Sequence, residues 1–226
     1  MRGWVRVVGP GALLFTLTAV GCGGSDSGTV TKWMGAARHL RIVGTIMGEK
    51  IDINVAVPDA NDTTKLWCER EYQVPNDASG MPNYAAGHNA EVRIKGPITM
   101  NGMTRLLDFG LKRHNYQADA AGTVVPVIPR DDANSPCGLN SCTNDNMWLS
   151  WTWRNPADNS VLYKSAAQSG SFTLGEYVGT PDAGGLLIPP NTGDIGGFAT
   201  GQWSATESIS ASFDANCTTN QIDNSY

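Results

Sequence analysis

Apolar and polar residues alternate with a period of two in many short segments of this chain. The clearest segment runs from Ile51 to Val57, where every second residue is Ile or Val. Successive side chains of a β-strand point to opposite faces, so this alternation predicts a strand with one buried face. The preceding segment, 41–47, is rich in β-branched residues, and residues 41–57 are therefore predicted to form a hairpin. Similar alternation occurs in 65–74, 91–98, 107–112, 147–154 and 208–217.

Turn residues separate these segments. Asn101-Gly102 predicts a tight hairpin turn, and 156–159 predicts a turn between strands at 147–154 and 160–166. Residues 123–128 form a short apolar segment that Pro126 is expected to confine to a sheet edge. Long polar loops are expected at 75–90, 129–146 and 179–197. The pattern predicts an all-β fold, an antiparallel β-sandwich in preference to a barrel.

Composition agrees with a folded β protein and excludes several other classes. The chain has 226 residues, enough for one domain of ordinary size. Hydrophobic residues make up 41% of it, which is enough for a substantial core and excludes wholesale disorder. The formal charge of −5 gives no electrostatic basis for binding nucleic acid, so no nucleic-acid partner is expected.

The N-terminal residues have the layout of a secretory signal peptide. Arg2 and Arg6 provide a positive start, an apolar stretch follows, and small residues precede Cys22. The apolar stretch is shorter than the roughly 20 residues that a bilayer-spanning helix needs. We therefore expect an export signal at 1–21.

The residues Ala19-Val20-Gly21-Cys22 resemble the lipobox of bacterial lipoproteins, in which the cysteine is acylated and becomes the N-terminus. Ala19 stands where leucine is usual. The resemblance implies lipidation at Cys22 and, because Gly23 rather than Asp follows it, location at the outer membrane. Residues 22–30 are then a lipidated, flexible tether, and 31–226 a single β-sandwich domain. The alternative is a secreted protein in which Cys22 is an incidental thiol.

The chain after this signal resembles the small β-rich envelope lipoproteins of Gram-negative bacteria. The resemblance implies a binding or structural role in the cell envelope. The expected partners are the membrane, through the lipid anchor, and an envelope protein or polysaccharide. Two alternatives stay open: a glycan-binding or adhesive module, and a hydrolase whose site is assembled from residues distant in sequence.

Four cysteines besides Cys22 form an even set in an oxidising compartment. Cys68 and Cys217 lie in strand-like segments, whereas Cys137 and Cys142 are close in sequence between turn residues. The favoured pairing is Cys68–Cys217 with Cys137–Cys142. A zinc site would need CxxC or histidine at ligand spacing, and neither is present, so no metal or other cofactor is expected.

Recognisable catalytic signatures are absent from the sequence, including GxSxG, HExxH and the P-loop. Its three histidines, His39, His88 and His114, lie in unrelated segments and are predicted to be surface or loop residues. The 129–146 loop is rich in oxygen ligands that suit calcium, but its spacing fails the EF-hand pattern. It is predicted to be a polar loop closed by a disulfide.

Tryptophans are the other candidates for function. Trp151 and Trp153 share the phase of Met147 and Leu149, which predicts a place in the core. Trp148 lies in the opposite phase, and Trp67 shares the phase of acidic neighbours. Both are predicted to point outward, where they are possible contacts for a sugar ring.

Overall fold

The described part of the chain consists almost entirely of β-strands. The computed structural model describes residues 38–57, 64–73, 78–81, 88–116, 121–129, 137–138, 141–142, 147–177, 180–181, 187–188 and 192–223. The predicted signal peptide, Cys22 and the tether lie outside these residues. So does most of the 129–146 loop with its proposed calcium ligands.

The strands follow one another along the chain as short and long segments. Their bounds are β1 (His39–Ile46), β2 (Glu49–Ala56), β3 (Trp67–Gln73), β4 (His88–Met100), β5 (Met103–Tyr116), β6 (Val124–Val127), β7 (Cys137–Gly138), β8 (Ser141–Cys142), β9 (Met147–Arg154), β10 (Val161–Ala166), β11 (Ser169–Tyr177), β12 (Thr180–Pro181), β13 (Leu187–Ile188), β14 (Thr192–Gln202) and β15 (Ser208–Asp223).

Eleven of these strands belong to one mostly antiparallel sheet that is not closed. Its order is β14-β11-β6-β9-β5-β4-β3-β15-β1-β2, with β10 beside β9 and a further pairing of β14 with β15. The exceptions to antiparallel pairing are β15 with β3 and the single contact of β6 with β9. The predicted all-β, antiparallel fold is confirmed.

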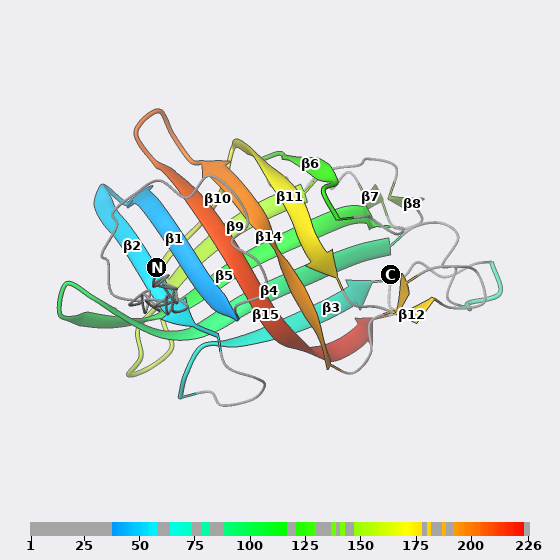
Figure 1. Ribbon diagram of the computed structural model, residues 1–226, viewed down its shortest axis with the longest axis horizontal. Helices are drawn as coiled ribbons and strands as arrows, with labels where there is room; N and C mark the ends of the chain where they lie inside the picture. The colour runs from blue at the N-terminus through cyan, green and yellow to red at the C-terminus, as the bar shows by residue number, and fades with distance from the viewer. Residues whose placement is uncertain are drawn as a thin grey trace, which may run out of the picture.

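The sheet folds over itself, so that β1, β15, β14 and β11 lie in front of β3, β4, β5 and β9 and cross them (Figure 1). The long strand β15 connects these layers by hydrogen bonds. Its first half pairs with β1 from Ile209 to Phe213, and its last residues pair with β3 from Thr218 onward. The two layers are therefore parts of one sheet rather than two independent sheets.

The core lies on the faces that the alternation predicted. Ile51, Ile53 and Val57 are buried, as are Trp151 and Trp153, which are 0% and 1% exposed. The two indoles meet edge to face with centroids 5.1 Å apart, a geometry that aromatic pairs prefer. The core assignment of Trp151 and Trp153 is confirmed.

Two predicted hairpins end in tight two-residue turns. Asn101 and Gly102 have positive φ angles of 50° and 75°, and Met47 and Gly48 have 57° and 69°. Positive φ at both central residues matches the right-handed twist of the flanking strands. The 41–57 hairpin is confirmed, although its turn lies at Met47-Gly48 and its first strand already begins at His39.

Two local predictions differ from the structure. The 179–197 segment was expected to be a loop, but β14 begins at Thr192 because its backbone pairs with both β11 and β15. The edge position expected from Pro126 is also wrong, since β6 lies between β11 and β9. Proline is tolerated there because β6 pairs with β9 at only one position, Val127 with Met147.

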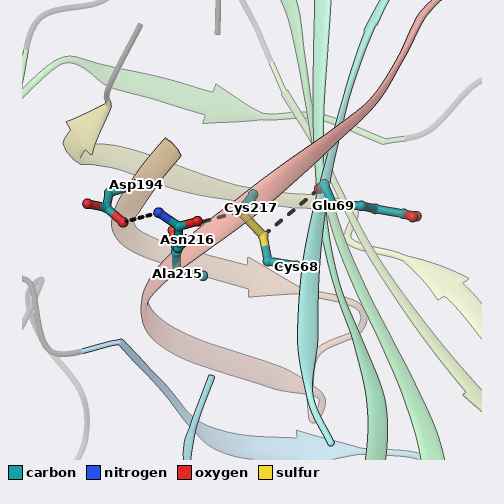
Figure 2. The surroundings of a disulfide bond; sticks show 6 residues. All are labelled: Cys68, Glu69, Asp194, Ala215, Asn216 and Cys217. Carbon is teal, nitrogen blue, oxygen red and sulfur yellow. Dashed lines mark hydrogen bonds between the residues drawn. A yellow bond between two sulfur atoms is a disulfide. The ribbon is translucent and has the colours of Figure 1, made fainter. Parts of the chain in front are cut away.

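The predicted Cys68–Cys217 disulfide is confirmed and joins β3 to β15 (Figure 2). Both cysteines are fully buried, and their Cα atoms are 4.5 Å apart. Cys137 and Cys142 face each other in the register of β7 and β8. Their side chains are not among those described, so the second bridge stays a prediction.

Candidate functional site

The outer face of β3, β4, β5, β9 and β10 carries a dense set of charged side chains, which we call the polar face. Directly opposed residues of neighbouring strands lie on the same side of a sheet. The register aligns three rows on this side: Trp67, Lys95, Asp108, Thr152 and Lys164; Glu69, Arg93, Gly110, Ser150 and Ala166; and Glu91, Lys112 and Trp148. The core residues occupy the opposite side of these strands.

Arg93 is the centre of the charge network. Its Nε donates to Asp108 Oδ1 at 3.1 Å, and its Nη2 donates to Asp108 Oδ2. The same guanidinium lies 3.8 Å from Oε1 of Glu69 and 3.8 Å from Oε1 of Glu91. Lys95 also pairs with Glu69. A buried carboxylate is costly unless it is paired, so these cations stabilise the acids beneath them.

A lysine covers each of the two outward tryptophans. Lys95 Nζ lies 5.2 Å from the ring centroid of Trp67, and Lys112 Nζ lies 5.9 Å from that of Trp148. Both distances fall within the range of a cation–π interaction. Each lysine stands directly opposite its tryptophan on the neighbouring strand, so the sheet register creates both pairs.

Trp148 lies on the predicted face, but its predicted exposure is wrong. It is outside the core cluster that contains Trp151 and Trp153, and yet it is only 7% exposed. A large ring on a crowded sheet face loses its solvent contact to long neighbours such as Lys112. Trp67 is half-buried. Contact of either ring with a sugar stays a prediction.

Two adjoining hollows open on the polar face. The first, which we call the polar hollow, has a volume of about 270 Å³ and is lined by Glu91, Arg93, Asp108, Lys112, Trp148, Ser150, Thr152, Arg154 and Lys164. The adjoining hollow, of about 520 Å³, shares Arg93, Asp108 and Arg154 and adds Trp67 and Lys95. Gly110 lies between the opposed residues of the middle row. A Cβ there would come within 2.6 Å of Ser150 Oγ, so glycine permits the close approach of Ser150.

The polar hollow is positive in an acidic chain. Its lining has four basic and two acidic side chains, an excess of two positive charges, whereas the whole chain carries −5. Burial lowers the pKa of the Lys95 ammonium; Asp108 opposes this shift, and the positive charge of Arg154 adds to it. Arg154 is thus close enough to Lys95 for the two cations to repel each other.

The polar hollow contains two carboxylates that sequence reasoning did not nominate, Glu91 and Asp108. Such a pair is the arrangement that glycoside hydrolysis uses. However, both oxygens of Asp108 accept hydrogen bonds from Arg93. This carboxylate is engaged in an ion pair rather than placed to exchange a proton with a ligand.

A histidine, a serine and an aspartate also come together, on the outer side of β1 and β15. Burial lowers the pKa of His39, and the negative charge of Asp214 opposes this shift. Ser212 stands two residues before Asp214 and is fully buried. Neither ring nitrogen of His39 makes a hydrogen bond within the described structure, so the bonded chain of a catalytic triad is not formed there. The side chains of His88 and His114 are not among those described.

The sequence marked Arg93, Asp108 and Lys112 as outward-facing members of alternating strands. It contained no signal that Arg154 and Lys164, from β9 and β10, would line the same hollow. That information lies in the strand register, because residues 46 to 71 positions away from Arg93 reach its side only through β5 and β9.

No group of three or more His, Cys, Asp or Glu side chains that could hold a metal ion occurs among the described residues. Within the same ranges, the chain forms no helix long and apolar enough to cross a bilayer. Comparison of the chain with known protein families, curated proteins and solved structures gives no match.

Proposed function

We propose that the chain is a lipid-anchored protein of the cell envelope whose polar hollow is a binding site. The hollow carries this proposal, because it is a recessed and charged site on hydrogen-bonded strands. Sites built on strands hold their side chains more precisely than sites on loops. The Arg93–Asp108 pair fixes the position of both side chains before any ligand arrives.

The proposed anchor is an acyl group on Cys22, and the proposed location is the outer membrane. Residues 23–28 are Gly-Gly-Ser-Asp-Ser-Gly, a composition typical of a flexible linker. A tether of this kind would let the domain reach ligands near the membrane surface. The crossing of β1, β15, β14 and β11 over β3, β4, β5 and β9 supports our classification of the domain as a β-sandwich (Figure 1).

A binding role is favoured over hydrolysis by the state of the carboxylates in the hollow. General acid–base catalysis needs a carboxylate that can exchange a proton with the substrate. Asp108 is held on both oxygens by Arg93, and the guanidinium also lies near Glu91. The arrangement therefore suits recognition better than bond cleavage.

Glycan binding is the second candidate, and Trp67 is the observation in its favour. This ring is half-buried and lines the adjoining hollow together with Asn159. Aromatic rings and amide groups are suitable partners for a sugar. Lys95 already lies over the ring, so at least part of the indole is occupied.

The anchor is tested by metabolic labelling of cells that express the full chain with palmitate. We expect the wild-type protein and the matched cysteine control Cys142→Ala to be labelled and to sediment with membranes. Cys22→Ala should be unlabelled and should accumulate as the unprocessed precursor. Equal labelling of Cys22→Ala and wild type would contradict the lipid anchor.

The binding role is tested with the full-chain protein, purified in detergent, and insoluble cell-wall polysaccharide. Retention that Trp67→Ala abolishes would support the glycan-binding candidate. Release of new reducing ends, lost in Glu91→Gln and Asp108→Asn, would support the hydrolase instead and contradict a purely binding role. Lys50→Gln is a control, because Lys50 is exposed on β2 and lines neither hollow of the polar face.

A further inference from the structure

We propose that the polar hollow binds a small anion bearing phosphate or carboxylate groups, with Arg154 and Lys164 as its direct contacts. This inference rests on the proposed binding function and specifies the class of ligand. It is argued from the distribution of charge within the hollow, the positions of the two rim cations and the volume available.

The inner charges of the polar face are already matched. Asp108 accepts two hydrogen bonds from Arg93, and Glu69 pairs with Lys95. The side chains of these two acids are only 10% and 7% exposed, so they form the floor of the site. A ligand cation would find the floor carboxylates occupied, which argues against a cationic ligand.

The outer charges are positive. Arg154 and Lys164 both line the polar hollow, and neither forms an ion pair with a carboxylate among the described residues. Arg154 Nη1 donates to the carbonyl oxygen of Asn159 at 3.2 Å, which holds the side chain but leaves other guanidinium donors for a ligand. Lys164 is exposed on β10, directly opposite Thr152.

Lys112 brings a third positive charge into the same hollow. Its ammonium lies over the ring of Trp148, which restricts where the flexible side chain places its charge. A charge that is already positioned loses less entropy when a ligand binds. The tryptophan therefore supports an anion site by holding a cation, and its covered ring is poorly placed to stack on a sugar.

The electrostatic field favours the same class of ligand. A positive recess in an otherwise acidic molecule concentrates anions locally and steers their approach. Planar guanidinium groups bind carboxylate and phosphate through paired hydrogen bonds, and lysine adds a point charge. The volume of about 270 Å³ suits a small molecule or one terminal group of a larger one.

The test is isothermal titration calorimetry on the full-chain protein purified in detergent. The probes are inorganic phosphate, citrate and the neutral sugar glucose. We expect one or both anions to bind, glucose not to bind, and the affinity to fall as salt is raised because the contacts are electrostatic. Stronger binding of phosphate would indicate a phosphorylated ligand, and stronger binding of citrate a carboxylated one.

Two substitutions locate the site. Lys164→Gln and Arg154→Gln should each weaken anion binding about tenfold, since a lost charge-assisted hydrogen bond costs on the order of one such step in the dissociation constant. The matched control is Lys50→Gln, which removes the same charge from an equally exposed strand lysine far from the hollow in the sheet order. It should change the affinity by less than about twofold.

Three results would overturn the anion site. These are no binding of either anion at millimolar concentration, equal weakening by Lys50→Gln and Lys164→Gln, or binding of glucose that Trp67→Ala abolishes. The last result would leave the proposed binding function intact and change only its ligand. Palmitate labelling at Cys22 is independent of all three, so failure of the anchor and failure of the anion site are distinguishable.

Discussion

Both carboxylate oxygens of Asp108 accept hydrogen bonds from Arg93, although the two residues are not directly opposed in the β4–β5 ladder. Arg93 stands opposite Gly110, and Lys95 stands opposite Asp108. A Cβ on Gly110 would lie 3.8 Å from Arg93 Cγ, so the arginine stem runs beside a position that has no side chain. The diagonal pairing leaves Lys95 for Glu69 and Trp67.

Removing one partner of this ion pair should destabilise the protein. Asp108→Asn keeps the shape of the side chain but removes its charge, and we expect a loss of about 1–3 kcal/mol in the free energy of unfolding. Arg93→Gln should cost more, because it leaves Glu69, Glu91 and Asp108 without their shared cation. Urea denaturation of both variants measures the order. Wild-type stability in Asp108→Asn, or the reverse order, would show that the network contributes little.

The tryptophan strand β9 offers a comparison of its two faces. Truncating Trp151 or Trp153 to alanine removes a fully buried ring and should cost about 3–5 kcal/mol. Trp148→Ala should cost less, about 1–3 kcal/mol, because its ring is buried on the charged face beside Lys112 rather than in the core. Thermal melts of the three variants test this. Melting temperatures for Trp151→Ala and Trp153→Ala near that of the wild type would contradict the core assignment.

The Cys68–Cys217 bridge should contribute strongly to stability because it joins residues 149 positions apart. In the chain-entropy model a longer loop is stabilised more, and loss of a native bridge typically costs about 2–5 kcal/mol. We expect Cys68→Ala/Cys217→Ala to melt at a lower temperature than Cys137→Ala/Cys142→Ala, whose predicted loop is short. Non-reducing peptide mapping checks both connectivities. A peptide joining Cys68 to Cys137 or Cys142 is incompatible with this prediction.

Burial of His39 makes stability depend on pH. Its pKa in the folded chain is lowered from 6.5 by burial, and Asp214 only partly offsets this. Below about pH 6.5 the unfolded chain therefore binds a proton that the folded chain resists, so stability is lost as the pH falls through this range. We expect the wild type to lose more stability than His39→Asn between about pH 7.5 and pH 5.5. Parallel losses in the two proteins would show that other groups control the acid response.

Local patterns were sufficient to identify most strands and their buried faces. The alternation at 51–57 and at 147–154 placed Ile51, Ile53, Trp151 and Trp153 in the core, because a strand's period of two depends only on its own backbone. Asn101-Gly102 marked a turn for an equally local reason, the positive φ angles that its two residues adopt. The pairing of Cys68 with Cys217 followed from cysteine number and strand phase.

Only the tertiary structure decided which strands are neighbours, and this determines the polar hollow. Lys164 reaches Asp108 through the register of β10 with β9 and of β9 with β5. The burial of Trp148 and the joining of both layers through β15 likewise depend on contacts between distant segments. A strand's sequence states which of its faces is polar, but a shift of two residues in register preserves that face and changes every neighbour on it. For that reason the sequence of this protein specified its strands and its core, and the register between strands assembled its candidate site.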